Sequence, residues 1–389
     1  MKKSEILEKS KELLLEIAKI GKKHIGKLKI KRLFPFVHYF DRRDFLDLKA
    51  LDKNDGLWSR REILARYLLL RAVLDHGPDS DGLERFVQKI INSLYEKEIR
   101  IFHKPLDFFR EIGIAIDNIL KSHASVKKIR AAIWAKENHA NPDKYNLFLD
   151  NSKQVLNYAI FRWGVPLALP LLLSNDGLSL VEYIENHSSS EIMSRELKDH
   201  NRYGLGKAIG DKAAHLFAKW YVHSFKIAKT KTNAWGNLSF ELPLDSNAGR
   251  VLFRTGWLLY FTTRKVLQDW EVIQKNKGKG GTHYLRVTNL RGIKTNFFDT
   301  NSPLFKNYIT ICQDYLKTKQ RPRSVEIQQI PNVLLLNTKY GIGDLDDGLM
   351  YIGTSVCFNL EKPKCSKCPI QKFCLGHKKY PQLIRNYST

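Results

Sequence analysis

The sequence is poor in cysteine and contains no long apolar run. Five cysteines occur in 389 residues, and four of them lie between positions 357 and 374. An odd, clustered set of this kind does not suit a disulfide framework. The most apolar stretch, residues 164–173, contains two prolines and is about half as long as a bilayer requires. Residues 1–31 lack the apolar core of a signal peptide. We therefore expect a soluble cytoplasmic, nucleoid-associated protein with no membrane partner.

Acidic residues are also few. The chain has 65 Lys and Arg against 40 Asp and Glu, a formal net charge of +25. Such an excess attracts polyanions, so nucleic acid is the leading expected partner. The alternative is a solvated surface in an organism whose proteins are generally basic. The 43% hydrophobic content is typical of a globular protein, and the length allows two domains.

Most of the chain has helical periodicity, which predicts an all-α fold. Ser59 and Asp81 are expected to cap the second and third helices. Strand-like segments are short, at 238–242 and 284–288, and the Gly- and Lys-rich segment 274–286 predicts either a mobile basic loop or an exposed hairpin tip. Helices are expected at 1–31, 60–74, 83–95, 106–121, 151–162, 178–186 and 211–225.

The clustered cysteines indicate a metal site. Cys357, Cys365, Cys368 and Cys374 follow the spacing C-x7-C-x2-C-x5-C. Structural zinc sites usually join two separate C-x2-C knuckles, and this segment has one. A short loop with four thiolates suits a [4Fe–4S] cluster, in which each iron takes one thiolate. Zinc and a metal-free loop are the alternatives. The remaining cysteine, Cys312, is predicted to lie in the core.

Lysines surround the cysteines, whereas Glu361 is almost the only acid. We expect this loop to face a phosphate backbone. A redox role is the competing interpretation, although no flavin or nicotinamide fingerprint supports it. The lysines are Lys362, Lys364, Lys367, Lys372, Lys378 and Lys379.

The segment LMYIGTSVCFNLEKPKCSKCPIQKFC, residues 349–374, resembles the end of the helix-hairpin-helix DNA glycosylases, the superfamily of endonuclease III and the adenine glycosylases. Its KPKCSKCPIQ portion is especially similar to the adenine glycosylase branch. That family has C-x6-C-x2-C-x5-C, one residue shorter than this chain. The resemblance implies a two-lobe, all-α fold with a C-terminal [4Fe–4S] loop. It also implies a monomeric DNA N-glycosylase that removes a base from double-stranded DNA, with or without AP lyase activity.

A second similarity lies in LPLDSNAGRVLFR, residues 242–254. The family places its catalytic aspartate at the start of a helix in a segment of similar form, and Asp245 falls on that position. A carboxylate there would stabilise the positive charge that develops on the sugar as the N-glycosidic bond breaks. The plainer interpretation is that Asp245 caps a helix, and the two roles are compatible.

The family's hairpin is expected upstream, in RYGLGKAIGDKAAHLFAKWYV, residues 202–222. One register puts Gly210 on the second hairpin glycine and Lys212 on the lysine that attacks the sugar C1′ in bifunctional members. The other uses Gly204 and Gly206 for the turn, followed by Lys207. In either register the resemblance implies that turn amides bind a DNA phosphate. Lys212 is then the lyase nucleophile or a solvated lysine.

Residues 68–82 place Asp75, His76, Asp79 and Asp81 at a helix end. By position they resemble the family segment that lines the base pocket, so His76 or Asp75 would contact an extruded base. Helix caps and turn formers explain the same residues, and an Mg²⁺ or Ca²⁺ site is a third alternative. Among the tryptophans, Trp235 is the best candidate for a base contact.

The expected domains are 1–59, an N-terminal segment that packs with the C-terminal lobe; 60–240, a helical domain with the hairpin; and 241–389, the C-terminal lobe with a large insertion and the cluster loop. Two other functions compete with base excision. One is an iron–sulfur nuclease, although no acidic metal-binding motif with a following lysine is found. The other is a DNA-binding scaffold in which Asp245 is only a cap.

Overall fold

The chain is predominantly helical in the computed structural model, as the sequence predicts. The structure describes residues 2–33, 60–75, 80–121, 124–138, 153–228, 242–257, 260, 276–277, 283–284, 330–331, 334–335, 338–360 and 362–385. None of the helices in these ranges is long and apolar enough to cross a bilayer.

The chain divides into two compact units. Unit 1 contains residues 1–27 and 232–389, and unit 2 contains residues 28–231. The N-terminal helix up to Lys27 thus belongs to the same unit as the C-terminal helices. The boundaries expected from the sequence lie after residues 59 and 240.

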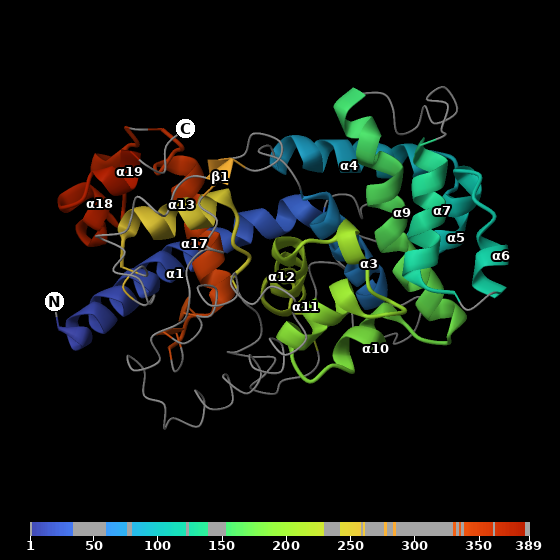
Figure 1. Ribbon diagram of the computed structural model, residues 1–389, viewed down its shortest axis with the longest axis horizontal. Helices are drawn as coiled ribbons and strands as arrows, with labels where there is room; N and C mark the ends of the chain where they lie inside the picture. The colour runs from blue at the N-terminus through green and yellow to red at the C-terminus, as the bar shows by residue number, and fades with distance from the viewer. Residues whose placement is uncertain are drawn as a thin grey trace. The chain divides into compact units, whose positions relative to one another are not determined.

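Unit 2 is built around α9 (Lys153–Asn175), which packs against α3 (Arg60–Leu74), α5 (Pro105–Glu111) and α7 (Val126–Asn138) (Figure 1). Its other helices are α4 (Ser80–Glu96), α6 (Ile116–Lys121), α10 (Leu180–Glu185), α11 (Ser190–Asp199) and α12 (Asp211–Lys219), the last continued by a π-helical turn, η5 (Trp220–Ser224).

The helix expected at 151–162 continues as α9 to Asn175, through Pro166 and Pro170. A proline inside a helix costs about 3 kcal/mol. Residues 163–173 are all buried, however, and each large apolar side chain removed from water contributes about 1.5–3 kcal/mol. Burial of this segment therefore offsets the hydrogen bonds that the prolines lose.

Other boundaries also differ from expectation. The helix expected at 106–121 is divided into α5 and α6, with Gly113 in the left-handed region at φ 68°. Because α4 begins at Ser80, Asp81 lies inside its first turn instead of capping it. The helices α7 and α11 were not anticipated, while Ser59 lies outside the described residues.

Unit 1 combines α1 (Lys3–Leu33, which extends past the unit boundary) with α13 (Ser246–Thr255), α17 (Ile342–Ser355), α18 (Leu375–Lys378) and α19 (Gln382–Arg385). Two glycines let α1 and α17 touch. A methyl group on Gly21 would collide with the Asp344 carbonyl, and one on Gly348 would collide with the Ile17 carbonyl. Close contact at these two points fixes where α17 crosses α1, and hence where the segment after α17 begins.

Two short strands are described within the segment 274–286. In β1 (Asn276–Lys277) and β2 (His283–Tyr284), Asn276 pairs with Tyr284 and Lys277 with His283, antiparallel. This pairing agrees with the hairpin alternative. Leu242 is not in a strand, and residues 238–241 and 285–288 lie outside the described residues.

Candidate functional site

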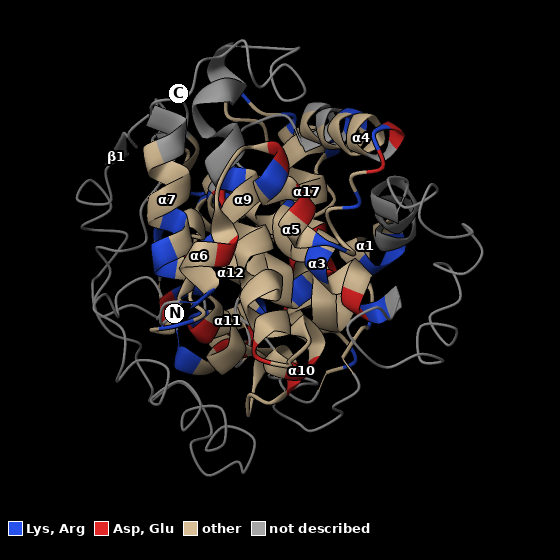
Figure 2. Cartoon of the chain, turned by 90° about the vertical axis from the view of Figure 1, so that its right-hand side faces the viewer, with Lys and Arg blue, Asp and Glu red and all other residues tan. Residues whose placement is uncertain are grey.

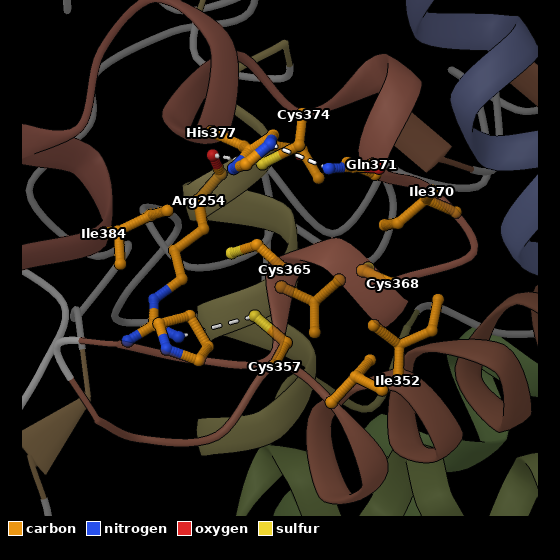
Figure 3. A pocket seen from close by; sticks show the side chains of 14 residues that line it. Arg254, Ile352, Cys357, Cys365, Cys368, Ile370, Gln371, Cys374, His377 and Ile384 are labelled. Carbon is orange, nitrogen blue, oxygen red and sulfur yellow. Dashed lines mark hydrogen bonds between the residues drawn. The ribbon is translucent and has the colours of Figure 1, made fainter.

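Four cysteine side chains line one pocket in unit 1 (Figure 3). Cys357 follows α17, and its amide donates to the Ile352 carbonyl at 2.8 Å. The other three lie at the ends of short helical turns, Cys365 and Cys368 at η11 (Cys365–Lys367) and Cys374 between η12 (Gln371–Phe373) and α18. Apolar side chains complete the wall, among them Val251, Ile352, Ile370 and Ile384.

The pocket desolvates the thiols. Burial raises the pKa of Cys374 to about 12 and that of Cys368 to about 11, and it also raises the pKa of Cys365. All four cysteines are free thiols. Thiolates are ligands for zinc and iron–sulfur clusters, and a bound cation would compensate for their desolvation.

The two metals require different arrangements of sulfur. Zinc needs its ligands about 2.3 Å from one centre, whereas a [4Fe–4S] cluster takes each thiolate on a different iron. Within the described ranges, no three or more His, Cys, Asp or Glu side chains are grouped to hold a single metal ion. The four cysteines nevertheless line one pocket, and four thiols are a donor set that both structural zinc sites and iron–sulfur clusters use.

Two buried arginines of α13 hold the start of the cysteine loop. Arg250 Nε donates to the Cys357 carbonyl at 2.7 Å, and its Nη2 donates to the Gly353 carbonyl at 2.9 Å. Arg254 donates to the carbonyls of Phe358 at 2.6 Å and Leu360 at 3.0 Å. Its Nη1 also lies 3.4 Å from the Cys357 sulfur (Figure 3).

The end of α13 packs against the end of the same loop. Gly256 ends the helix at φ 81°, where other residues are strained. A methyl group on Gly376 would come within 2.5 Å of the Arg254 carbonyl. Trp257 Nε1 donates to the Phe373 carbonyl at 2.6 Å. Helix α13 and the cysteine loop therefore form one packed element.

Asp245 is the N-cap of α13. Its Oδ1 accepts hydrogen bonds from the amides of Asn247 and Ala248, both at 2.8 Å. Its backbone is extended, as in other N-caps. The aspartate therefore begins a helix, as the sequence predicts, and its carboxylate is held in one orientation at the end of α13 that lies away from Gly256.

The loop lysines named as DNA contacts, Lys362, Lys364 and Lys367, are all exposed. Lys364 Nζ lies 5.2 Å from the centre of the Phe358 ring, and Lys372 Nζ lies 4.8 Å from that of Phe373. These four cations are in the same unit as Asp245. On the side of the molecule that Figure 2 shows, basic residues are distributed over several of the described helices.

The hairpin candidates lie between α11 and α12 in unit 2. Gly210 is the exposed N-cap of α12, which has no side-chain cap. Gly206 has φ 59°, and a methyl group there would collide with the Arg130 guanidinium, whose Nη1 donates to the Leu205 carbonyl at 3.0 Å. Gly204 has no room for a methyl group beside the backbone of His200. The first register thus coincides with the start of α12, while the Gly204–Gly206 pair shapes the preceding turn, where Lys207 is exposed.

Lys212 lies in the first turn of α12 and forms an ion pair with Asp75, the residue that follows α3. Its Nζ also donates to the Asp75 carbonyl at 3.4 Å. Lys212 belongs to unit 2, whereas Asp245 belongs to unit 1. Nothing in the spacing of Asp75 and Lys212 along the sequence indicates this contact.

Some candidates lie outside the described residues: His76, Asp79, Trp235 and Cys312. Three other residues with contacts in the site segments were not predicted. The spacing of four between Arg250 and Arg254 places them on one face of a helix, which is the one local signal that indicates a shared role. The contact between Arg130 and Gly206 joins segments far apart in the sequence, so no local pattern predicts it.

Comparison with known proteins gives no relative to guide the assignment. No protein-family model, curated protein or solved structure matches the chain significantly. Any functional conclusion must therefore come from the site itself.

Proposed function

We propose that the protein is a DNA glycosylase that removes a base from duplex DNA, with Asp245 as the catalytic carboxylate. The observation that carries the proposal is the attachment of α13 to the cysteine loop. Asp245 begins this helix, and Arg250 and Arg254 bind it to the backbone at residues 353–360. A fixed carboxylate and an exposed set of lysines are thereby part of one unit.

Asp245 has the features that the reaction requires. As the C1′–N bond breaks, its electron pair leaves with the base and positive charge develops on the sugar. A carboxylate fixed before the reaction stabilises that charge without the cost of reorienting itself. The two amide hydrogen bonds to Oδ1 supply this fixation. Water would then bond to C1′ and complete the hydrolysis.

The cysteine loop would supply affinity. Lys362, Lys364 and Lys367 are exposed on a short loop, where they can neutralise backbone phosphates without reading sequence. Cys357, Cys365, Cys368 and Cys374 would hold a [4Fe–4S] cluster, which when bound would cross-link a loop that has little apolar core of its own.

The test is base release from duplexes that carry oxidised, deaminated or mismatched bases, without added metal. Asp245→Asn should lower the rate about 100-fold or more. Asparagine caps helices about as well as aspartate, so the variant should unfold at the wild-type temperature. Asp117→Asn removes a carboxylate from the first turn of another helix, α6, and serves as the matched control. Equal rates for wild type and Asp245→Asn would refute the assignment.

The same assay distinguishes the alternatives. The cap formed by Asp245 is also what a non-catalytic scaffold would retain, and such a protein would bind duplex DNA and release no base. A nuclease would cut strands only when Mg²⁺ is added.

A further inference from the structure

Unit 1 has a second surface on which aromatic and basic side chains meet, where α1 crosses α17 (Figure 1). The rings of His24 and Tyr351 are stacked there, with centres 3.9 Å apart and planes 14° from parallel. His24 is half-buried, whereas Tyr351 is 37% exposed. Because His24 covers one face of the Tyr351 ring, the exposed area belongs to the other face and the edge. The stack therefore has an end to which another flat ring can be added.

Two lysines lie beside a second aromatic ring on this surface. Lys22 Nζ is 5.6 Å and Lys339 Nζ is 5.4 Å from the centre of the Tyr340 ring. Both lysines are exposed, and so is Lys23. The described residues 19–24 and 338–354 present no exposed carboxylate, because the three aspartates in them are buried in α17. The charged groups that face the solvent here are therefore basic, which suits phosphate groups.

The two parts of this surface lie at different positions along α17. Tyr340 comes just before the helix, and Tyr351 lies in its third turn. A strand that runs along α17 can thus place phosphates near Lys22 and Lys339 and a base on Tyr351. Proteins that bind single strands combine basic side chains with aromatic rings in this way. In a duplex, by contrast, the faces of each base are covered by its neighbours.

We propose that this surface binds single-stranded DNA, with a base stacked on Tyr351 and phosphates held by the lysines. We call it the α1–α17 surface, and it consists of Lys22, Lys23, His24, Lys339, Tyr340 and Tyr351. The inference goes beyond the proposed function, which concerns duplex DNA, and it rests on that function only for the choice of DNA over RNA. Different side chains contact base and phosphate, so each contact can be removed separately.

The first experiment compares two labelled single strands of equal length by fluorescence anisotropy, an oligothymidine and an abasic strand with the same phosphates. Wild type should bind the oligothymidine about tenfold or more tighter than the abasic strand. Tyr351→Ala should lose most of this difference, and Tyr351→Phe, which keeps the ring, should retain it. Trp134→Ala is the matched control, because it removes an aromatic side chain that is 48% exposed in unit 2. The same preference in wild type and Tyr351→Ala would refute the stacking.

The second experiment repeats the oligothymidine titration over a range of salt concentrations. Each lost phosphate contact should reduce the slope of log K against log salt by about 0.7. Lys339→Gln should therefore reduce the slope by that amount, whereas Lys11→Gln, which removes an exposed lysine elsewhere on α1, should leave it unchanged. An equal reduction in both variants would show a general effect of charge and overturn the phosphate contacts. This comparison does not depend on the folding of Tyr351→Ala.

The same titrations with an oligouridine and with vesicles of anionic phospholipid test other partners of this surface. Tighter binding of the RNA strand than of the DNA strand would overturn the choice of DNA. Binding to vesicles that requires Tyr351, without binding to either strand, would refute the proposal and indicate a membrane surface. Base release that is unaffected by Asp245→Asn would refute the proposed function instead, while the strand titrations would still decide the role of Tyr351.

Discussion

Arg254 is the side chain whose removal should most weaken the site in unit 1. It is 1% exposed and donates to two loop carbonyls, at 2.6 and 3.0 Å. Hydrogen bonds from charged groups contribute about 1.5–3 kcal/mol each, and unmatched acceptors add a desolvation cost. Arg254→Ala should therefore lower the free energy of unfolding by about 3–5 kcal/mol. For a chain of 389 residues that corresponds to a fall of about 4–6 °C in the unfolding midpoint.

Thermal unfolding followed by circular dichroism, together with iron analysis of the purified chain, measures the effect. The variant should also bind less iron, because the carbonyls of Phe358 and Leu360, which follow Cys357, would no longer be held to α13. Lys364→Ala is the matched control on the same loop, since an exposed cation should change stability by about 0.5 kcal/mol or less. The reasoning is refuted if the two variants have the same midpoint, or if Arg254→Ala lies within about 2 °C of wild type.

Three further predictions follow from packing, burial and the thiol set. Gly348→Ala should destabilise the chain by about 1–3 kcal/mol in urea unfolding, because the methyl group meets the Ile17 carbonyl. Gly341→Ala, at an N-cap that faces open space, should cost about 1 kcal/mol or less. Burial, followed by the charges of Arg100, Arg66 and Lys104, lowers the pKa of His103 to about 4 from 6.5. Between about pH 6.5 and pH 4 the unfolded chain therefore binds a proton at His103 that the folded chain does not. The free energy of unfolding should fall as the pH drops through this range, and it should fall less in His103→Gln. An equal pH dependence in wild type and His103→Gln would contradict this. The purified chain should be brown and contain about four iron atoms, and the Cys368→Ala variant should be colourless. A colourless wild-type protein that contains zinc would refute the iron–sulfur assignment.

The structure bears out the predicted elements where the signal is local. The apolar periodicity of residues 60–74 predicts a helix, and α3 has those bounds. Asp245 begins a helix because its side chain bonds to amides two and three residues ahead. Such contacts lie within one turn of the backbone, so the order of residues is sufficient to specify them.

Prediction failed where distant segments compensate for a local cost. Pro166 and Pro170 argue for a break, yet α9 continues because the surrounding helices bury it. Helices α7 and α11 were also not predicted. In each case the deciding interaction is packing against a segment that the local pattern does not identify.

The sequence by itself therefore determined that the fold is mainly helical, that four thiols are clustered, that the net charge is positive and that a helix begins at Asp245. Composition and contacts within one helical turn can be read directly from the sequence. The tertiary structure decided the contacts between distant positions: Arg250 and Arg254 with the cysteine loop, Arg130 with Gly206, and Asp75 with Lys212. Each of these depends on how separate helices pack, and packing brings together side chains whose spacing along the chain carries no signal.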